Sequence, residues 1–229
     1  MLNIALPKGR LGQEVYARFA AVGLDCPALA AALQDKDRRL IFRDEARQVS
    51  YMLVKPSDVA VYVERGAADL GVVGKDVLQE SRPDVYELLD LGLGCCRMCV
   101  AGRNNWREDP SLPLRVATKY PNTATEYFAA QNREIDVIKL HGSIELGPAL
   151  GLSDVIVDVV QTGATLKEND LSVYQVIAPS SARLIANKSS YQFERESIDQ
   201  LVSGLRAISP NINSKVDKSR GGDPREVAL

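Results

Sequence analysis

Short apolar, β-rich runs alternate with helical patterns along almost the whole chain, and this alternation limits the possible folds more than any other feature. The first run, from Leu2 to Leu6, precedes a helical pattern that ends at Gly23. Further strand-like runs lie at 39–42, 51–54, 70–73, 115–118, 135–140 and 155–160. This alternation indicates an α/β fold with mainly parallel sheets. No low-complexity linker separates the units, so two lobes would need strands that cross between them.

Two of the helical patterns have recognisable ends. Ser57 can cap a helix that carries Val59 and Val63 and ends at Gly66. The last helix is predicted from a stripe of apolar residues, namely Ile198, Leu201, Val202, Leu205 and Ile208. Residues 211–229 are polar and without periodicity, so we predict that they are disordered.

Charge and length describe an ordinary globular protein. The 229 residues carry 28 basic and 30 acidic side chains, for a net charge of −2. This balance does not suggest a nucleic-acid or membrane surface, although a local cluster of cations could still bind a small anion. Met1 to Leu6 pass directly into a strand without a basic leader, and no apolar run could span a bilayer. We therefore expect a cytoplasmic protein.

The four cysteines do not predict a metal site. Cys95, Cys96 and Cys99 lie close together in sequence, but Cys26 and the single histidine, His141, are far away. A zinc site would need a fourth ligand at suitable spacing. We expect reduced and mostly buried thiols on a strand, and a structural role for His141.

The most informative segment runs from Asp154 to Lys167. An apolar strand ends near Asp158, and Thr162, Gly163 and Thr165 follow before a helix begins. Backbone N–H groups, hydroxyls and a glycine in such a turn can bind a phosphate. Asp158 would then face the sugar of a ribose phosphate and stabilise positive charge at its anomeric carbon. Alternatively the threonines only cap a helix, and the residues alone leave both interpretations open.

Residue types and spacings across the chain resemble those of the ATP phosphoribosyltransferases. The similarity centres on Glu145, Gly151, Ser153, Ile156, Asp158, Val159 and the run from Thr162 to Leu166. Five other segments also resemble family segments, in the same order: 6–10, 37–40, 66–76, 115–120 and 141–145. The length resembles that of the family's short form, which lacks a C-terminal regulatory domain.

The resemblance implies two α/β lobes similar to type II periplasmic binding proteins, with the active site in the cleft between them. Lobe I would comprise residues 1–91 and 178–229 and provide the nucleotide side. Lobe II would comprise residues 92–177 and contain the phosphoribosyl pyrophosphate loop.

The resemblance also implies roles for individual residues. The phosphoribosyl pyrophosphate site would contain Asp158, Gln161, Thr162, Gly163, Ala164 and Thr165. The ATP site would contain Lys8, Gly9, Arg10, Arg38, Asp69, Ser143 and Glu145. Asp158, Arg38 and Arg10 would be catalytic. Local sequence leaves three simpler alternatives open. Lys8 and Arg10 could be solvated surface charges, Asp69 could be an ordinary turn residue of an α/β fold, and Ser143 and Glu145 could cap a helix.

The implied reaction is the first step of histidine biosynthesis. ATP and 5-phosphoribosyl 1-pyrophosphate would give N1-(5-phosphoribosyl)-ATP and pyrophosphate, with Mg²⁺ carried mainly by the phosphate groups of the substrates. The resemblance further implies a homodimer within a hetero-oligomer, inhibited by histidine through a subunit that resembles histidyl-tRNA synthetase. Gln161 departs from the family pattern, since many short-form relatives carry an acid there. The alternatives are a two-lobed solute-binding protein and a phosphoribosyltransferase that acts on a free base.

Overall fold

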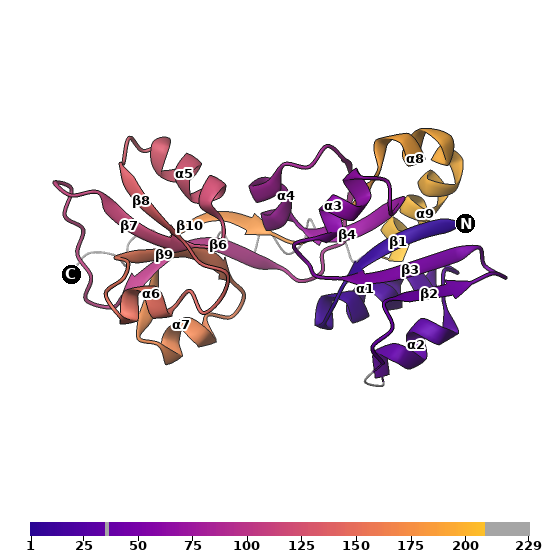
Figure 1. Ribbon diagram of the computed structural model, residues 1–229, viewed down its shortest axis with the longest axis horizontal. Helices are drawn as coiled ribbons and strands as arrows, with labels where there is room; N and C mark the ends of the chain where they lie inside the picture. Colours follow the sequence, from indigo (N-terminus) through magenta and orange to yellow (C-terminus); the bar gives the residue numbers. More distant parts are fainter. Residues whose placement is uncertain (35–36, 209–229) are drawn as a thin grey trace.

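The computed structural model describes residues 1–34 and 37–208, which form two α/β lobes, each built on one sheet (Figure 1). The sheet of lobe I has six strands in the order β2-β3-β1-β4-β11-β5. The sheet of lobe II has five strands in the order β10-β6-β9-β7-β8. The two lobes confirm the predicted fold class. The expectation of disorder for residues 211–229 lies outside the described residues.

The elements of lobe I come from both ends of the described chain. Its strands are β1 (Leu2–Pro7), β2 (Ile41–Asp44), β3 (Val49–Val54), β4 (Leu70–Gly74), β5 (Tyr86–Asp90) and β11 (Ala182–Ala186). Its helices are α1 (Arg10–Ala21), α2 (Pro27–Gln34), α3 (Val59–Glu64), α4 (Lys75–Ser81), α8 (Lys188–Phe193) and α9 (Arg195–Ile208).

The elements of lobe II form one continuous stretch. Its strands are β6 (Cys96–Arg103), β7 (Leu114–Thr118), β8 (Ile135–Lys139), β9 (Val155–Val160) and β10 (Leu171–Ser180). Its helices are α5 (Pro121–Ala129), α6 (Leu146–Ala149) and α7 (Ala164–Glu168).

Both sheets are mixed, which corrects the prediction of mainly parallel sheets. β1 pairs in parallel with β3 and β4, and β7 pairs in parallel with β8 and β9. β2, β5, β6, β10 and β11 instead join their neighbours in antiparallel fashion. The prediction failed because an apolar run indicates that a strand is buried, but it does not indicate whether that strand runs parallel or antiparallel to its neighbours.

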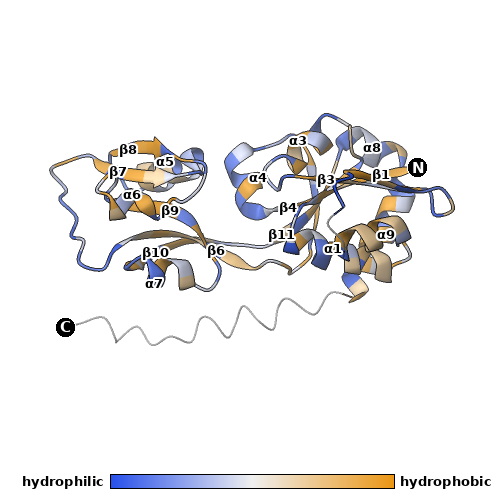
Figure 2. Cartoon of the chain, turned by 60° about the horizontal axis from the view of Figure 1, so that its bottom comes forward, coloured by the Kyte–Doolittle hydropathy of each residue, from blue (hydrophilic) through white to orange (hydrophobic). Residues whose placement is uncertain are grey.

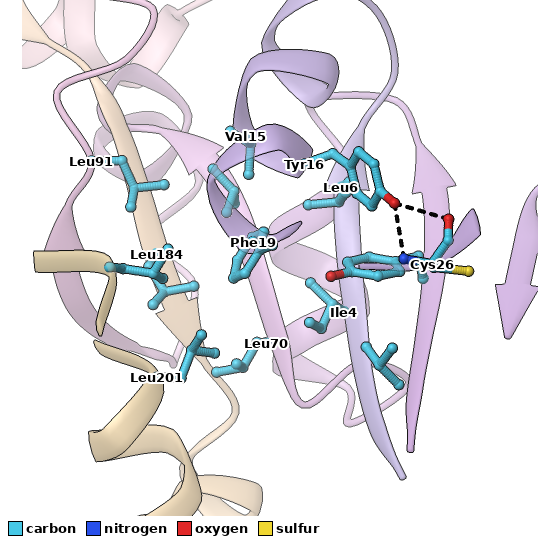
Figure 3. Close-up of a cluster of buried hydrophobic side chains, with 14 of the residues drawn as sticks. Ile4, Leu6, Val15, Tyr16, Phe19, Cys26, Leu70, Leu91, Leu184 and Leu201 are labelled. Carbon is cyan, nitrogen blue, oxygen red and sulfur yellow. Dashed lines mark hydrogen bonds between the residues drawn. The ribbon is translucent and has the colours of Figure 1, made fainter. Parts of the chain in front are cut away.

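Helices cover both faces of the lobe I sheet, and the core lies between these layers. On one face, α1 contributes Val15 and Phe19, and both residues are fully buried against the strands (Figure 3). Tyr16 packs beside them, and its hydroxyl donates to the Cys26 carbonyl and accepts from the Cys26 N–H, each at 2.9 Å. On the opposite face, α3 packs through Val59 and Val63. Each fully buried side chain of this size stabilises the fold by about 1.5–3 kcal/mol.

Hydrophobic residues gather in the strands of both sheets (Figure 2). In lobe II, α5 packs on one face of the sheet, and α7 contributes Leu166 to the other. Among the described residues, no helix combines the length and the apolar character needed to cross a membrane.

The chain crosses between the lobes twice, at neighbouring points. It leaves β5 at Asp90 and enters β6 at Cys96, and it returns from β10 to β11 around Ser181. The two crossings are bonded to each other, because the Leu91 N–H donates to the Ala182 carbonyl and the Ala182 N–H donates to the Leu93 carbonyl, both at 2.9 Å. β10 pairs with β6 as far as Ser180, whereas the predicted change of lobe was at residue 178.

Two local expectations are corrected by the structure. Asp58, not Ser57, occupies the cap position of α3, and the Ser57 hydroxyl donates to the Asp58 carboxylate. Cys95 is exposed and precedes β6, whereas Cys99 is buried within the strand as expected. All four thiols are free.

Candidate active site

The turn after β9 is open to solvent and begins a short helix. Gly163 has φ = +80°, a left-handed conformation that glycine adopts without the steric cost of a side chain. The Ala164 N–H donates to the Thr162 hydroxyl at 3.4 Å, and the side chains of Gln161, Thr162 and Thr165 are exposed. The turn therefore presents hydroxyls and backbone to a ligand arriving from outside.

Asp158 lies on β9, three residues before this turn, and its side chain is only 14% exposed. Its Oδ1 atom accepts a hydrogen bond from the Val159 N–H at 2.8 Å and lies 3.2 Å from Lys119 Nζ. Burial raises the pKa of Asp158, and the nearby charge of Glu145 acts in the same direction. The ammonium of Lys119 and the Val159 N–H oppose this rise. The site thus contains a largely buried carboxylate that lies beside one cation.

The loop from Lys8 to Arg10 follows β1 and reaches across to lobe II. Gly9 has φ = +94° and ψ = −163°, which only glycine adopts readily. Arg10 begins α1, and its Nη2 atom donates to Gln161 Oε1 at 3.1 Å. Arg10 also pairs with Glu14 at 3.3 Å. A cation from lobe I therefore meets the turn of lobe II directly.

A hollow of about 330 Å³ adjoins this loop. Lys8 and Gly9 line it on one side, and Asp37, Arg38 and Arg39 line it on another. Asp37 pairs with Arg39 at 2.7 Å and accepts a hydrogen bond from its N–H at 2.8 Å. Among the described residues no ion pair involves Arg38, so its charge is available to a ligand.

Ser143 and Glu145 precede α6 but do not cap it, which corrects the capping alternative. Glu145 occupies the cap position, but its side chain makes no capping hydrogen bond among the described residues. Ser143 is exposed and has φ = +49°. Glu145 instead acts through its charge on Asp158.

Comparison with known proteins gives the family. The family model described as "HisG: ATP phosphoribosyltransferase" matches residues 55–207. A protein named ATP phosphoribosyltransferase from Brachyspira hyodysenteriae is 51% identical over 209 residues, which cover 91% of this chain and 100% of that protein. The chain belongs to the ATP phosphoribosyltransferase family. It is therefore a transferase of histidine biosynthesis, as the sequence predicted.

Further comparisons agree with this family membership. An ATP phosphoribosyltransferase from Caldanaerobacter subterraneus subsp. tengcongensis is 48% identical, covering 91% of this chain and 97% of that protein. The solved structure titled "ATP phosphoribosyl transferase (HisG:HisZ) complex from Thermotoga maritima" matches with a TM-score of 0.78 and 32% identity, covering 90% of this chain and 98% of that one. A substrate-binding protein of an amino acid ABC transporter matches with a TM-score of 0.56 at 13% identity, covering 95% of this chain and 96% of that one, which shows a shared fold.

One residue expected at the ATP site of this transferase lies elsewhere. Asp69 directly precedes β4, and the first residue of β4, Leu70, pairs with Ile4 of β1. Asp69 therefore lies near the amino end of β1, whereas Lys8 follows the carboxyl end of that strand. Its carboxylate accepts from the Asn3 N–H at 2.8 Å and from the Ser190 hydroxyl at 2.7 Å. Asp69 therefore joins β1 to α8 at the amino end of the strands, away from Lys8, and it is not part of the site proposed below.

One residue was missed by the sequence prediction. Lys119 was recognised only as part of a family segment, yet it contacts Asp158. β7 and β9 are parallel neighbours in which Thr118 pairs with Val157, so the residues that follow these two are neighbours as well. The sequence places a lysine and an aspartate near the ends of two strands, but their contact could be predicted only if these strands were known to be neighbours.

A larger hollow, of about 720 Å³, lies away from these residues in lobe II, around Arg115 and Arg133. Both guanidinium groups are already paired, with Asp154 at 2.6 Å and with Glu108 at 2.6 Å. Arg107 also lines this hollow, but two of its three guanidinium groups are neutralised, so size alone does not make this hollow a site for a polyanionic substrate.

Proposed function

We propose that this chain joins ATP to 5-phosphoribosyl 1-pyrophosphate where its lobes meet. The turn of lobe II would bind the phosphoribosyl group, and the loop and hollow of lobe I would bind ATP. One observation carries the proposal: the hydrogen bond of 3.1 Å from Arg10 to Gln161, which brings the cationic loop to the turn.

The phosphoribosyl half of the site rests on the residues from Asp158 to Thr165. The exposed hydroxyls of Thr162 and Thr165, with the backbone around Gly163 and Ala164, suit the oxygens of a 5-phosphate. Each charge-assisted hydrogen bond contributes about 1.5–3 kcal/mol, so several together would bind the sugar phosphate firmly. Asp158 would face the ribose and stabilise the positive charge that develops at the anomeric carbon.

The ATP half rests on the cations around the smaller hollow. Lys8 and Arg38 line it, and Arg10, which follows Gly9 in the same loop, contacts Gln161 of lobe II. A guanidinium can bind two oxygens of a phosphate group at once, which suits Arg38 to a triphosphate or to the departing pyrophosphate. Ser143 and Glu145 would complete the site from lobe II, where the charge of Glu145 raises the pKa of Asp158.

The chemistry would be a displacement at the anomeric carbon. Adenine N1 of ATP attacks, the bond to pyrophosphate breaks, and its electron pair leaves with the pyrophosphate oxygen. The protein's part is to align two polyanions and offset their repulsion with Lys8, Arg10 and Arg38. Mg²⁺ bound to the phosphate oxygens would offset further charge.

A regulatory partner is part of the proposal. The Thermotoga maritima structure is titled a complex of HisG with HisZ, and this chain matches 98% of the compared chain. We infer that this chain also works in a hetero-oligomer, with a subunit that resembles histidyl-tRNA synthetase and transmits inhibition by histidine. Because ATP and phosphoribosyl pyrophosphate are cytoplasmic metabolites, the proposed place of action is the cytoplasm.

The decisive experiment is a pyrophosphate-release assay with ATP, phosphoribosyl pyrophosphate and Mg²⁺, on the full chain with and without the regulatory subunit. Asp158→Asn should lower kcat by about 10²-fold, because a neutral amide cannot stabilise the developing charge. Calorimetric ATP binding by this variant should stay within about threefold of the wild type, since the carboxylate faces the other substrate.

Asp136→Asn is the matched control, because Asp136 is an exposed aspartate on β8 of the same lobe. It should leave kcat unchanged. Unchanged turnover in Asp158→Asn would contradict the assigned role. A wild type that releases no pyrophosphate from this pair of substrates, even with its partner present, would contradict the proposed activity as a whole.

A further inference from the structure

Lys119 lies against the carboxylate that the proposed reaction requires. It follows β7 directly, and its Nζ atom is 3.2 Å from Asp158 Oδ1. The Lys119 side chain is 38% exposed, whereas that of Asp158 is 14% exposed. The ammonium therefore covers the carboxylate on its solvent side.

The neighbour of Lys119 is fixed by lobe I. Tyr120 is only 7% exposed, and its hydroxyl donates to Asp76 Oδ2 on α4 at 2.8 Å. The other oxygen of Asp76 accepts from the Ser180 hydroxyl at 2.8 Å. Lys119 Nζ stands over the Tyr120 ring, 5.4 Å from its centroid. A residue of lobe I thereby orients the ring on which the ammonium rests.

A second contact of α4 fixes the chain just beyond Tyr120. Glu80 lies four residues after Asp76, on the same side of the helix. Its carboxylate accepts from the Asn122 N–H at 3.0 Å, and from the Thr123 N–H and hydroxyl at 2.9 Å each. These bonds satisfy N–H groups in the first turn of α5, which otherwise have no partner in the helix. The segment that carries Lys119 is thus bonded to lobe I.

We propose that Lys119 is a positioning residue of the transfer reaction, which holds Asp158 charged and in place, and that helix α4 of lobe I fixes Lys119 through Tyr120. This inference rests on the role proposed above for Asp158.

Several titratable groups surround Asp158, and one of them is Tyr120, whose phenol stays neutral because burial raises its pKa. Burial and Glu145 both raise the pKa of Asp158, so both favour its neutral form. Lys119 lowers the pKa through its positive charge, and the Val159 N–H lowers it through a hydrogen bond. Cys99 stands opposite on β6, and its thiol stays neutral because burial raises its pKa. Without Lys119, the remaining environment would raise the pKa of Asp158 further and weaken its preference for the charged form, which is the form that can stabilise a cationic ribose.

The test combines two pH titrations on the full chain. Carbon-13 NMR of labelled aspartates, with Asp158 assigned by comparison with Asp158→Asn, follows its ionisation directly and needs no activity. The pH profile of kcat/KM follows the essential groups of the free enzyme and substrates. Ionisation of the substrates is common to all variants, so differences between them belong to the protein.

Lys119→Met should raise the pKa of Asp158 by about one unit or more, which is the usual effect of losing an adjacent opposite charge. The acidic limb of kcat/KM should move upward by the same amount. Lys119→Arg should restore most of the wild-type profile, which a purely structural loss would not allow. Tyr120→Phe keeps the ring but removes the bond to Asp76, and it should cause a smaller shift in the same direction.

Lys139→Met is the matched control, because Lys139 is an exposed lysine on β8 of the same lobe, and it should leave both titrations unchanged. An Asp158 titration in Lys119→Met that coincides with that of the wild type would overturn this inference alone. If Lys119→Met does not fold, the Lys119→Arg variant provides the test. An acidic limb of kcat/KM that is shifted from the wild type as far in Lys119→Arg as in Tyr120→Phe would also overturn the inference. Absence of pyrophosphate release by the wild type would instead overturn the proposed function.

Discussion

Substitution of Gly12 by alanine should disconnect the cationic loop from the turn of lobe II. Gly12 lies in the first turns of α1, two residues after Arg10, and a Cβ atom there would stand 1.9 Å from the Pro7 carbonyl oxygen. Ordinary contact begins at 3.4 Å, so helix and strand must separate by about 1.5 Å. A backbone carbonyl within β1 cannot rotate away, so the start of α1 has to move.

This displacement of helix α1 is large enough to break the hydrogen bond between Arg10 and Gln161. A shift of about 1.5 Å would stretch the bond from Arg10 to Gln161 from 3.1 Å to well beyond hydrogen-bonding distance. Overpacking of this kind costs about 1–3 kcal/mol, and the helix propensity of alanine returns at most about 1 kcal/mol. Urea denaturation should therefore show a loss of about 1–2 kcal/mol. KM for phosphoribosyl pyrophosphate should rise about tenfold, the equivalent of one charge-assisted hydrogen bond.

Gly204→Ala is the matched control in helix α9. A Cβ atom there would lie 3.4 Å from Val22 Cγ1, at the limit of ordinary contact, and far from the site. This variant should gain up to about 1 kcal/mol of unfolding free energy and keep its KM. If Gly12→Ala instead unfolded at the wild-type urea concentration with an unchanged KM, the proposed link between helix packing and the loop would be refuted.

Two further predictions concern the contact of α4 with α5 and an ion pair within lobe II. Glu80→Ala should lower the free energy of unfolding by about 1–3 kcal/mol, because N–H groups at the start of α5 lose their acceptor; a urea melt equal to that of the wild type would contradict this. The pairing with Arg115 lowers the pKa of Asp154, so the stability that it contributes is present above the ordinary value of 3.8 and is lost as the pH falls below it. Denaturation at several pH values should therefore show Asp154→Asn less stable than the wild type at neutral pH, with the difference shrinking in acid.

The sequence was sufficient to predict most strands and the class of fold. The run from Leu2 to Leu6 became β1, and the runs at 70–73, 115–118 and 155–160 became β4, β7 and β9. These runs succeed because strands buried on both faces must be apolar throughout. The apolar stripe from Ile198 to Leu205 likewise became the buried face of α9. Strand direction did not follow from the same evidence.

The site was predictable only in part, for a related reason. Motifs located Lys8, Arg10, Arg38 and the turn after Asp158, because each lies in a short contiguous segment. Whether segments meet depends on strand order, which no local pattern contains. Asp69 was therefore assigned to the site although it lies at the other end of the strands, and its place in a family segment did not reveal this. The contacts of Glu80 with α5 join residues more than 40 positions apart, and nothing in either segment predicts the other.

The paired crossings between the lobes restrict how the two halves of this enzyme can move. Because the segments at Leu91 and Ala182 are bonded to each other, they behave as one two-stranded ribbon. Such a ribbon bends and twists more easily than it slides, since sliding would break both bonds at once. Gly92 and Gly94, with φ of +62° and +58°, border the bend on one strand. The lobes should therefore rotate about one hinge axis through this ribbon, so that substrates bound to the two lobes approach each other along one arc.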